Sequence, residues 1–456
     1  MKNVTISAIG QADDTLLLSN DIHALAFLLQ LTLNFCKKHN VELSVEKLKL
    51  QAYEVSSKSP ARVFFNPMQI NGKTIPFSNE AEHVGILRSI FGNSPSILSR
   101  LSAHRAALAS VLHTGMAKGH RAGPASSIRI NQMYGIPVLL SGISSLVLSN
   151  KDIDIIERHH SETLRKLQRL LKNTPRCVTY FLSGNLPGAA LVHLRQLCLF
   201  GMICRLQTSI LHDCAMNFFT EVYHNRTSWF QQIRRWCLQY GLPHPLQLLY
   251  NPLSKAAMKT LAKKKVIDYW ETKLRTEAES LKSLTYFNPN FMSLQTAHPI
   301  WLTASNSPRQ VSMATIQAVM LSGRYRCGSL MQHWSPNNDG VCQLSATCKD
   351  RSVIEDLDHI LRICPALHQL RLNLSDFTHN YSGKLHVDIS SILLRKCNPQ
   401  NPNFVHFLLD CSSDNDVIKL SQKLSPDILR HLYLVTRTWI FNLHRQRLRM
   451  LGRWRS

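Results

Sequence analysis

The stretch Val4-Thr5-Ile6-Ser7-Ala8-Ile9-Gly10-Gln11-Ala12-Asp13-Asp14-Thr15-Leu16-Leu17-Leu18 is the starting point for interpreting this chain. Its two ends are short runs of β-branched or aliphatic residues, which predict two strands joined by a tight hairpin bend at Asp13 and Asp14. Adjacent carboxylates resist joint ionisation unless a cation lies between them, and Mg²⁺ uses oxygen ligands of this kind in phosphoryl-transfer sites. The alternative is an ordinary Asp-Asp surface turn.

Four further elements follow this hairpin in order. Ser19 or Asn20 is expected to cap a helix whose apolar residues recur at helical spacing: Ile22, Leu25, Ala26, Leu29, Leu33 and Cys36. The next segment, residues 44–50, predicts a strand with Lys47 and Lys49 on one face. Asn71-Gly72 predicts a two-residue hairpin, because both turn positions favour positive φ. Residues 83–86, His-Val-Gly-Ile, predict a further strand.

In this order the elements resemble the palm of reverse transcriptases from non-LTR (LINE-type) retrotransposons, starting with the Ala12-Asp13-Asp14 hairpin. The resemblance implies Mg²⁺-assisted nucleotidyl transfer to a primer 3′-OH. Asp13 is then the main metal ligand, Asp14 assists, and Lys47 or Lys49 lies near the phosphates of the incoming nucleotide. Without the resemblance, two solvated lysines on a half-buried strand explain the same residues.

The resemblance also implies that His83 and Gly85 lie on a primer-grip strand, where glycine lets the nucleic-acid backbone approach closely. A plain packed strand is the alternative. The chain departs from the family at position 11, where Gln11 replaces the aromatic residue that precedes Ala-Asp-Asp. The third metal-binding carboxylate, the fingers and any endonuclease region would precede residue 1, so we expect a C-terminal fragment that does not polymerise DNA by itself.

The charge balance points to a polyanionic partner. The chain has 53 Lys and Arg residues against 29 Asp and Glu, a net charge of +24. Such a surplus favours RNA or DNA, because neutralising phosphates releases condensed counterions. An acidic membrane surface ranks second, and simple solubility is the remaining alternative.

The sequence shows no apolar run of the ~18–20 residues that cross a bilayer, and no signal-peptide pattern. The 12 cysteines are thinly spread over 456 residues, which indicates a reducing compartment. We therefore expect an intracellular protein, nuclear or cytoplasmic, that is neither secreted nor bound to a membrane.

Residues 91–250 predict a mostly helical region. One helix beginning near Asn150 and stopped by Pro175 has an apolar inner face and a basic outer one, with Arg158, Arg165, Lys166, Arg169 and Lys172. By the resemblance this region is thumb-like, although such a face is usually only solvated. Residues 251–330 are interpreted as a connector, with a helix that Lys263-Lys264-Lys265 opens and a loop rich in proline.

A second group of chemically active residues lies at Cys342, Cys348, His359 and Cys364, spaced C-x5-C-x10-H-x4-C. Three thiolates and one imidazole form a closed tetrahedral set of the kind that structural Zn²⁺ prefers. Residues 353–357 are expected to form a helix that brings His359 and Cys364 to the first pair. The alternative is buried free cysteines beside a surface histidine. The segment from Glu355 to Pro365 resembles the C-terminal zinc knuckle of the same reverse-transcriptase family, which implies a structural zinc.

The C-terminal region, 376–456, is expected to end in a basic helix. Its arginines interleave with Trp439, Phe441 and Trp454, and the arginines are Arg437, Arg445, Arg447, Arg449, Arg453 and Arg455. Arginine with aromatic residues holds phosphates while stacking on unpaired bases. A frayed cationic tail is the alternative.

Together these features predict an α+β chain that is mostly α. The expected regions are a partial palm sheet at 1–90, a helical thumb-like region at 91–250, a connector at 251–330, a Cys-Cys-His-Cys zinc knuckle at 331–375 and a basic helical region at 376–456. The predicted function is that of a reverse-transcriptase fragment, inactive alone, that keeps RNA and DNA binding. The alternatives are a non-catalytic zinc-knuckle module for RNA or single-stranded DNA, and a helical protein-interaction domain.

Overall fold

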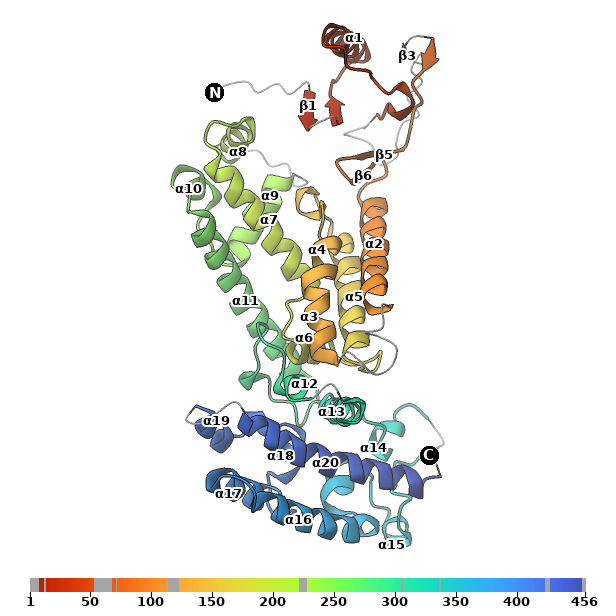
Figure 1. Ribbon diagram of the computed structural model, residues 1–456, viewed down its shortest axis with the longest axis vertical. Helices are drawn as coiled ribbons and strands as arrows, with labels where there is room; N and C mark the ends of the chain where they lie inside the picture. The colour runs from red at the N-terminus through yellow and green to blue at the C-terminus, as the bar shows by residue number, and fades with distance from the viewer. Residues whose placement is uncertain are drawn as a thin grey trace. The chain divides into compact units, whose positions relative to one another are not determined.

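The structure is a computed structural model that describes residues 8–11, 14–52, 68–70, 72–113, 123–220, 228–304, 307–335, 338–422 and 427–452 (Figure 1). The chain divides into two compact units that alternate along the sequence. Unit 1 comprises residues 1–107, 136–156 and 189–266, and unit 2 comprises residues 108–135, 157–188 and 267–456. The described residues are mostly helical with a few small sheets, which confirms the predicted α+β, mostly α class.

Unit 1 begins with three antiparallel strand pairs, each forming a sheet of its own. They are β1 (Ala8–Gln11) with β2 (Asp14–Leu17), β3 (Gln69–Ile70) with β4 (Lys73–Thr74), and β5 (Glu80–His83) with β6 (Ile86–Ser89). In the first pair Gln11 lies opposite Asp14, which confirms antiparallel pairing of the two flanks, whereas residues 4–7 of the predicted first strand and residues 12 and 13 of the bend lie outside the described residues. The predicted pairing around positions 71 and 72 is confirmed by β3 and β4.

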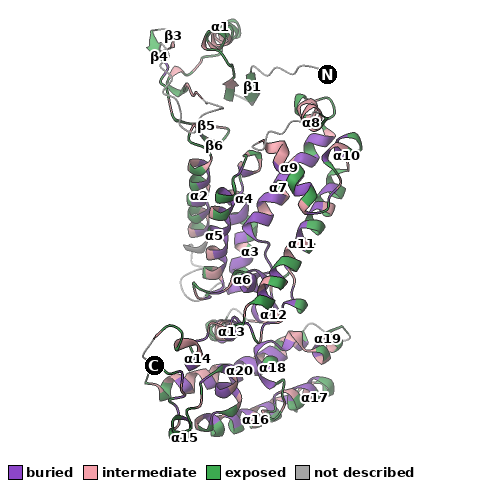
Figure 2. Cartoon of the chain, turned by 180° about the vertical axis from the view of Figure 1, so that it is seen from behind, coloured by how far each residue is buried: buried purple, intermediate pink, exposed green. Residues whose placement is uncertain are grey.

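Helix α1 (Ile22–Lys38) follows the first strand pair, and its cap is Asp21 rather than Ser19 or Asn20. The Ala24 N–H donates to Asp21 Oδ2 at 2.9 Å, which satisfies one of the otherwise unpaired amides of the first turn. The helix buries none of its residues, and Figure 2 shows it in the colours of exposed and intermediate residues.

The helical part of unit 1 is built around α7 (Gly188–Arg205). Trp236 of α9 (Trp229–Gln239) donates from Nε1 to Gln196 Oε1 at 2.8 Å, so two buried polar groups of α7 and α9 satisfy each other. The other elements that contribute to this unit are η1 (Val45–Lys47), α2 (Ser94–His113), α4 (Ile136–Leu139), η3 (Ile143–Ser145), α5 (Asn150–Leu167), α8 (Ile210–Thr220), α10 (Pro245–Tyr250) and α11 (Lys255–Ser280). Helices α2, α5, α7 and α11 cross the boundary between the units.

Unit 2 is organised around α20 (Asp427–Met450), the C-terminal helix. Helices α13 (Pro308–Leu321), α18 (Phe404–Leu409), α16 (His368–Ser382) and α17 (Val387–Lys396) pack against it, and Figure 2 shows the buried residues along it. Trp439 is fully buried and donates from Nε1 to Thr378 Oγ1 at 2.8 Å. The predicted C-terminal helix is therefore present, and the alternative of a frayed cationic tail does not hold for residues 427–450, because one side of this helix lies in the core of the unit.

The remaining elements of unit 2 are short. They are α3 (Pro124–Ile130), η2 (Asn131–Gly135), α6 (Arg176–Ser183), η4 (Pro289–Phe291), α12 (Pro299–Leu302), α14 (Gly328–Met331), α15 (Ala346–Asp350), η5 (His359–Ile363), η6 (Pro365–Leu367), η7 (Cys411–Ser413) and α19 (Asn415–Ser421). Gly184 ends α6 with φ of +63°, and a Cβ there would lie 2.2 Å from the Thr296 carbonyl carbon. Only glycine permits this turn and this approach.

Among the described residues, no single helix is long and apolar enough to cross a bilayer. Helices α6 and α7, which are bent relative to each other, reach that length and composition only when taken together.

Candidate metal centre

A short antiparallel pairing holds the first half of the candidate metal centre. Cys342 N–H donates to the Val353 carbonyl at 2.8 Å, and Glu355 N–H donates to the Gly340 carbonyl at 2.9 Å. Helix α15 lies within the connecting loop and carries Cys348. The prediction of a helix over residues 353–357 is therefore wrong for residues 353–356, because Ile354 forms an antiparallel bridge with Val341, next to Cys342.

A π-helical turn, η5, positions the second half. Asp356 Oδ1 accepts from His359 N–H at 2.7 Å and starts the turn, and Cys364 N–H donates to the His359 carbonyl at 2.7 Å. This bond joins residues five apart, as a π turn does, and such turns often occur at functional sites. It brings His359 and Cys364 to one side of the turn and explains why four residues separate them.

The four side chains meet in one buried cluster. Their ligand atoms all lie within 4.8 Å of one another, and the residues are Cys342, Cys348, His359 and Cys364. The Sγ atoms of Cys342 and Cys364 are 3.9 Å apart, and Cys348 Sγ is 3.6 Å from His359 Nε2. A tetrahedral zinc with Zn–S of about 2.3 Å and Zn–N of about 2.0–2.1 Å requires separations of about 3.8 and about 3.6 Å. These two separations match those of a zinc tetrahedron, and the cluster could hold a metal such as zinc.

Burial controls the protonation of these ligands. It raises the pKa of Cys342 to about 12 and also raises the pKa of Cys364, since a thiolate is costly away from water. Burial lowers the pKa of His359, which favours the neutral imidazole that metals bind. Arg371 donates to the Cys364 carbonyl, and a bound Zn²⁺ would supply the further positive charge that favours ionisation of the three thiols. The donor set thus fits a metal such as zinc.

Buried polar contacts attach this metal loop to neighbouring helices. Glu355 accepts from Arg447 Nη2 at 2.6 Å and from Arg447 Nε at 2.9 Å. The side chain of Arg447 is 5% exposed and that of Glu355 is 6% exposed. Glu355 Oε2 also accepts from Gly328 N–H at 2.9 Å, at the start of α14. On the other side, Arg371 of α16 donates to the Cys364 carbonyl. Helices α14, α16 and α20 therefore each form a hydrogen bond with the metal loop.

The residues predicted for the magnesium site are only partly described. Asp14 is the first residue of β2 and is exposed, whereas Asp13 lies outside the described residues. Lys47 and Lys49 are both exposed, but Lys47 ends the 3₁₀ turn η1 instead of lying on a strand. Among the described residues, the Cys342–Cys364 cluster is the group of metal-binding side chains that gathers. The magnesium site stays a prediction.

The predicted primer-grip strand is a hairpin turn instead. His83 is the last residue of β5 and pairs with Ile86, and Val84 and Gly85 form the turn with φ of +52° and +70°. A type I′ turn demands positive φ at both central positions, which explains the glycine. A Cβ at Gly85 would meet no atom within 4 Å, so close approach of another chain is not needed to explain it.

The C-terminal arginines fall into three groups. Arg447 is buried in the pair with Glu355, so the expectation that it faces a phosphate is corrected: its guanidinium already has a carboxylate partner. Arg445 is half-buried and Arg449 is exposed. Arg453 and Trp454 lie outside the described residues.

Sequence reasoning missed the partners of these groups. Glu355 and Arg447 are 92 positions apart, and the one available signal was the acidic run at 355–358 next to a metal-ligand histidine. Arg437 was likewise expected at the surface, yet it is 1% exposed and donates to the Ile300 carbonyl and Thr303 Oγ1. No local pattern distinguishes these arginines from solvated ones.

Comparison with known proteins adds no relative: no family model, no curated protein and no solved structure matches the chain. The class that the structure itself defines is a mostly helical protein with a buried Cys₃His cluster able to hold a metal such as zinc.

Proposed function

We propose that this chain is a zinc-stabilised nucleic-acid-binding protein of the non-LTR reverse-transcriptase type. The observation that carries the proposal is the buried cluster of Cys342, Cys348, His359 and Cys364, whose separations suit a closed zinc tetrahedron. All four positions are filled by the protein, which leaves no site for a reactive water, so the zinc has a folding role. The order of sequence motifs from Ala12-Asp13-Asp14 onward supports the family assignment.

Exposed cations of unit 2 support nucleic-acid binding. The outer side of α5 and the loop after it form a basic surface, defined by Arg158, Lys166, Arg169 and Lys172, all exposed. None of the ion pairs in the described part of the chain involves these four residues. The inner side of the helix buries apolar residues such as Ile156 and Leu164 together with polar ones such as His160 and Ser161. Cations of α5 and the loop after it that make no ion pair can therefore take phosphates without breaking one.

The first experiment measures bound zinc and binding to single-stranded RNA and DNA over a range of salt. We expect one zinc per chain and an affinity that falls steeply with salt. Cys348→Ser should release the metal, whereas Cys397→Ser, at another buried cysteine outside the cluster, should keep it. A chain that folds without any bound metal, or that binds no nucleic acid at physiological salt, would contradict the proposal.

A second experiment tests the basic surface. The triple change Lys166→Gln, Arg169→Gln, Lys172→Gln should make the slope of log affinity against log salt concentration less steep. With single strands we expect a change of about 0.7 for each lost phosphate contact. The matched control replaces Lys282, Lys349 and Lys384, which are exposed lysines of the same unit, by glutamine. Equal losses in both variants would show that net charge, and not this surface, is responsible.

Primer extension is a second candidate function, favoured by the pairing of Gln11 with Asp14, which puts Asp14 at the end of two paired strands. Under this hypothesis extension depends on Mg²⁺ and is abolished by Asp14→Ala, with Glu42→Ala as an exposed acidic control. If the unaltered chain extends no primer and Asp14→Ala keeps nucleic-acid binding, primer extension is ruled out and only the binding function remains.

A further inference from the structure

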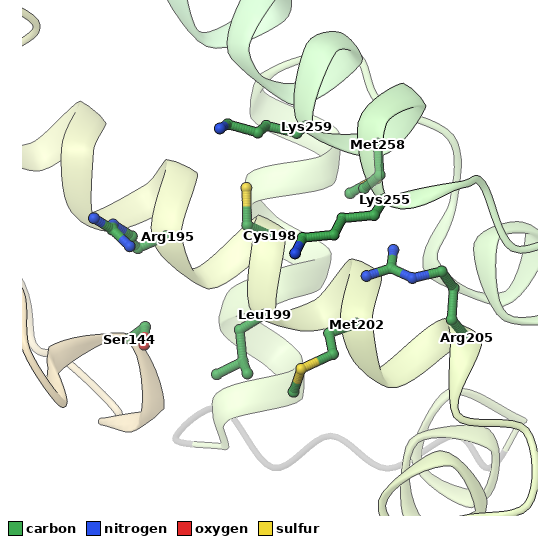
Figure 3. Close-up of a pocket in the computed structure, with 9 residues that line it drawn as sticks. All are labelled: Ser144, Arg195, Cys198, Leu199, Met202, Arg205, Lys255, Met258 and Lys259. Carbon is green, nitrogen blue, oxygen red and sulfur yellow. The ribbon is translucent and has the colours of Figure 1, made fainter.

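A cavity of about 360 Å³ lies between α7 and the start of α11, entirely within unit 1 (Figure 3). We call it the α7–α11 pocket. Its charged lining comes from both helices: Arg195 and Arg205 from α7, and Lys255 and Lys259 from α11. The rest of the lining is Ser144, Cys198, Leu199, Met202 and Met258. No acidic residue lines it.

A glycine fixes the close approach of the two helices beside this pocket. Gly201 of α7 faces Met258 of α11, and a Cβ at position 201 would lie 2.5 Å from Met258 Cγ. Met258 is buried and Gly201 is buried, so this contact is a packed one. The pocket is thus held between two helices that cannot slide apart without losing buried contacts.

The charges of the pocket are uncompensated within the part of the chain that the structure describes. No hydrogen bond or ion pair there involves the charged ends of Arg195, Arg205, Lys255 or Lys259. Lys255 and Lys259 also lie at the N-terminal end of α11, whose first turn has no acidic residue. Cations at this end oppose the helix dipole. Figure 3 shows the side chains of Lys255 and Arg205 extending in the same direction, and like charges that line one pocket repel each other.

The pKa of the Cys198 thiol is affected by three of the cations that line the pocket. Burial raises its pKa, and the cations of Arg195, Lys259 and Arg205 oppose that shift. Three positive groups therefore act on one half-buried sulfur at the floor of the pocket. An anion bound above this floor would offset their mutual repulsion.

The apolar part of the lining, which we call the floor of the pocket, indicates which group the bound anion carries. Leu199, Met202 and Met258 give it an apolar surface, and methionine adapts its shape to planar groups. A bare phosphate would leave this surface unused, and an acidic peptide would find Ser144 as its one neutral polar group in the lining. A nucleotide uses both parts, because its phosphate needs cations and its base needs an apolar contact. The volume falls in the usual range for small-ligand pockets.

We propose that the α7–α11 pocket binds a nucleotide, with the phosphate on Lys255, Lys259 and Arg205 and the base against Met202 and Met258. The nucleotide is either free or a terminal unit of a nucleic-acid strand, and these sources share the same chemistry. The proposal uses no residue of the zinc centre or of the basic surface on α5, so it does not depend on the proposed function.

The test is calorimetric titration of the full chain with AMP, inorganic phosphate, a 5′-phosphorylated trinucleotide and the same trinucleotide with a 5′-hydroxyl. We expect AMP to bind more tightly than phosphate. The double change Lys255→Gln, Lys259→Gln should weaken AMP about tenfold or more, since charged hydrogen bonds are lost. The matched control is Lys263→Gln, Lys264→Gln, two exposed lysines further along α11, and it should leave AMP binding unchanged. Met202→Gln should weaken AMP but not phosphate.

The trinucleotides separate the two sources. Preference for the 5′-phosphorylated strand identifies a strand end, and binding of AMP without either strand identifies a free nucleotide. The proposal is overturned if AMP binds no better than phosphate, or if the control variant loses as much affinity as the pocket variant.

A second readout covers the case in which the pocket variant fails to fold. Saturating AMP should slow alkylation of Cys198 in the unaltered chain, measured by mass spectrometry of its peptide, while Cys36 on α1 serves as the internal reference. No protection of Cys198 would also overturn the proposal. Cys348→Ser should leave AMP binding intact, so failure of the zinc site and failure of this pocket are distinguishable.

Discussion

Replacing Arg447 by methionine separates the structural role of this residue from the role that its sequence context suggests. Both members of its pair with Glu355 are almost fully buried, and the guanidinium donates two hydrogen bonds to the carboxylate. Arg447→Met leaves a buried carboxylate without its cation. Breaking a buried pair in this way costs about 3–5 kcal/mol. A residue that only contacts phosphate would leave stability unchanged.

The measurement is urea unfolding of the zinc-loaded chain, followed by tryptophan fluorescence and by release of zinc to a coloured chelator. We expect Arg447→Met to lower the unfolding midpoint and to speed zinc release, because Glu355 belongs to the segment that pairs with the strand of Cys342. Combining it with Glu355→Gln should cost less than the sum of the single changes, by about 0.5–3 kcal/mol. Arg449→Met is the control, since this residue is exposed and should change stability by less than about 0.5 kcal/mol.

Measurement of binding to single-stranded RNA tests the alternative that Arg447 contacts phosphate. If Arg447→Met kept full stability, weakened RNA binding and lowered the salt slope by one contact, Arg447 would be a phosphate ligand and the buried pair would be refuted.

Three further predictions concern other buried groups. Cys348→Ser should abolish zinc binding and lower stability, which metal analysis and thermal unfolding will show; a variant that keeps zinc would contradict the cluster. Gly184→Ala should cost more than about 1 kcal/mol, since φ is +63° and the Cβ would meet Thr296. Gly383→Ala should be close to neutral, since φ is −59° and the Cβ would make only van der Waals contacts at 3.9 Å. Burial and a nearby arginine lower the pKa of His444 to about 4 from its usual 6.5, so the folded state binds fewer protons than the unfolded state. Stability should therefore fall as the pH drops from 6.5 toward 4, and His444→Gln should flatten that fall in unfolding measured across the same range.

The features that the sequence predicted well are those whose signal is local. The paired strands around residues 11–14 and 70–73 follow from β-forming runs that flank turn residues, and register needs no distant partner. The two faces of α5 follow from helical periodicity, and Ile156 and Leu164 are buried as expected. The Cys₃His set was found because ligand identity limits the choice to a few residues, although its first gap is wider than usual.

The features that it predicted poorly depend on distant partners or on turn geometry. Residues 353–357 have helical composition, but Ile354 forms a bridge with Val341, so pairing overrides the local preference. Val84-Gly85 was assigned to a strand by its resemblance to the primer-grip strand, yet both residues have positive φ in a hairpin turn, a conformation that valine rarely adopts. The α7–α11 pocket joins residues from three separated segments, and no spacing rule links Ser144, Arg205 and Lys255.

Net charge alone overstates the surface that is available to a polyanion, and the structure shows which cations are available. Two arginines are bound inside unit 2. Arg447 pairs with the Glu355 carboxylate, and Arg437 donates to a backbone carbonyl and a threonine hydroxyl. Lys166 and Lys255 make no such contact, and they lie on surfaces of different chemistry, one a solvated helix face and one a cavity with an apolar floor. Salt should therefore weaken binding to the first surface steeply, because solvated contacts release counterions. Lys255 and Lys259 are also exposed, so salt should weaken phosphate binding in the pocket as well, whereas the apolar contact of the base should not depend on it.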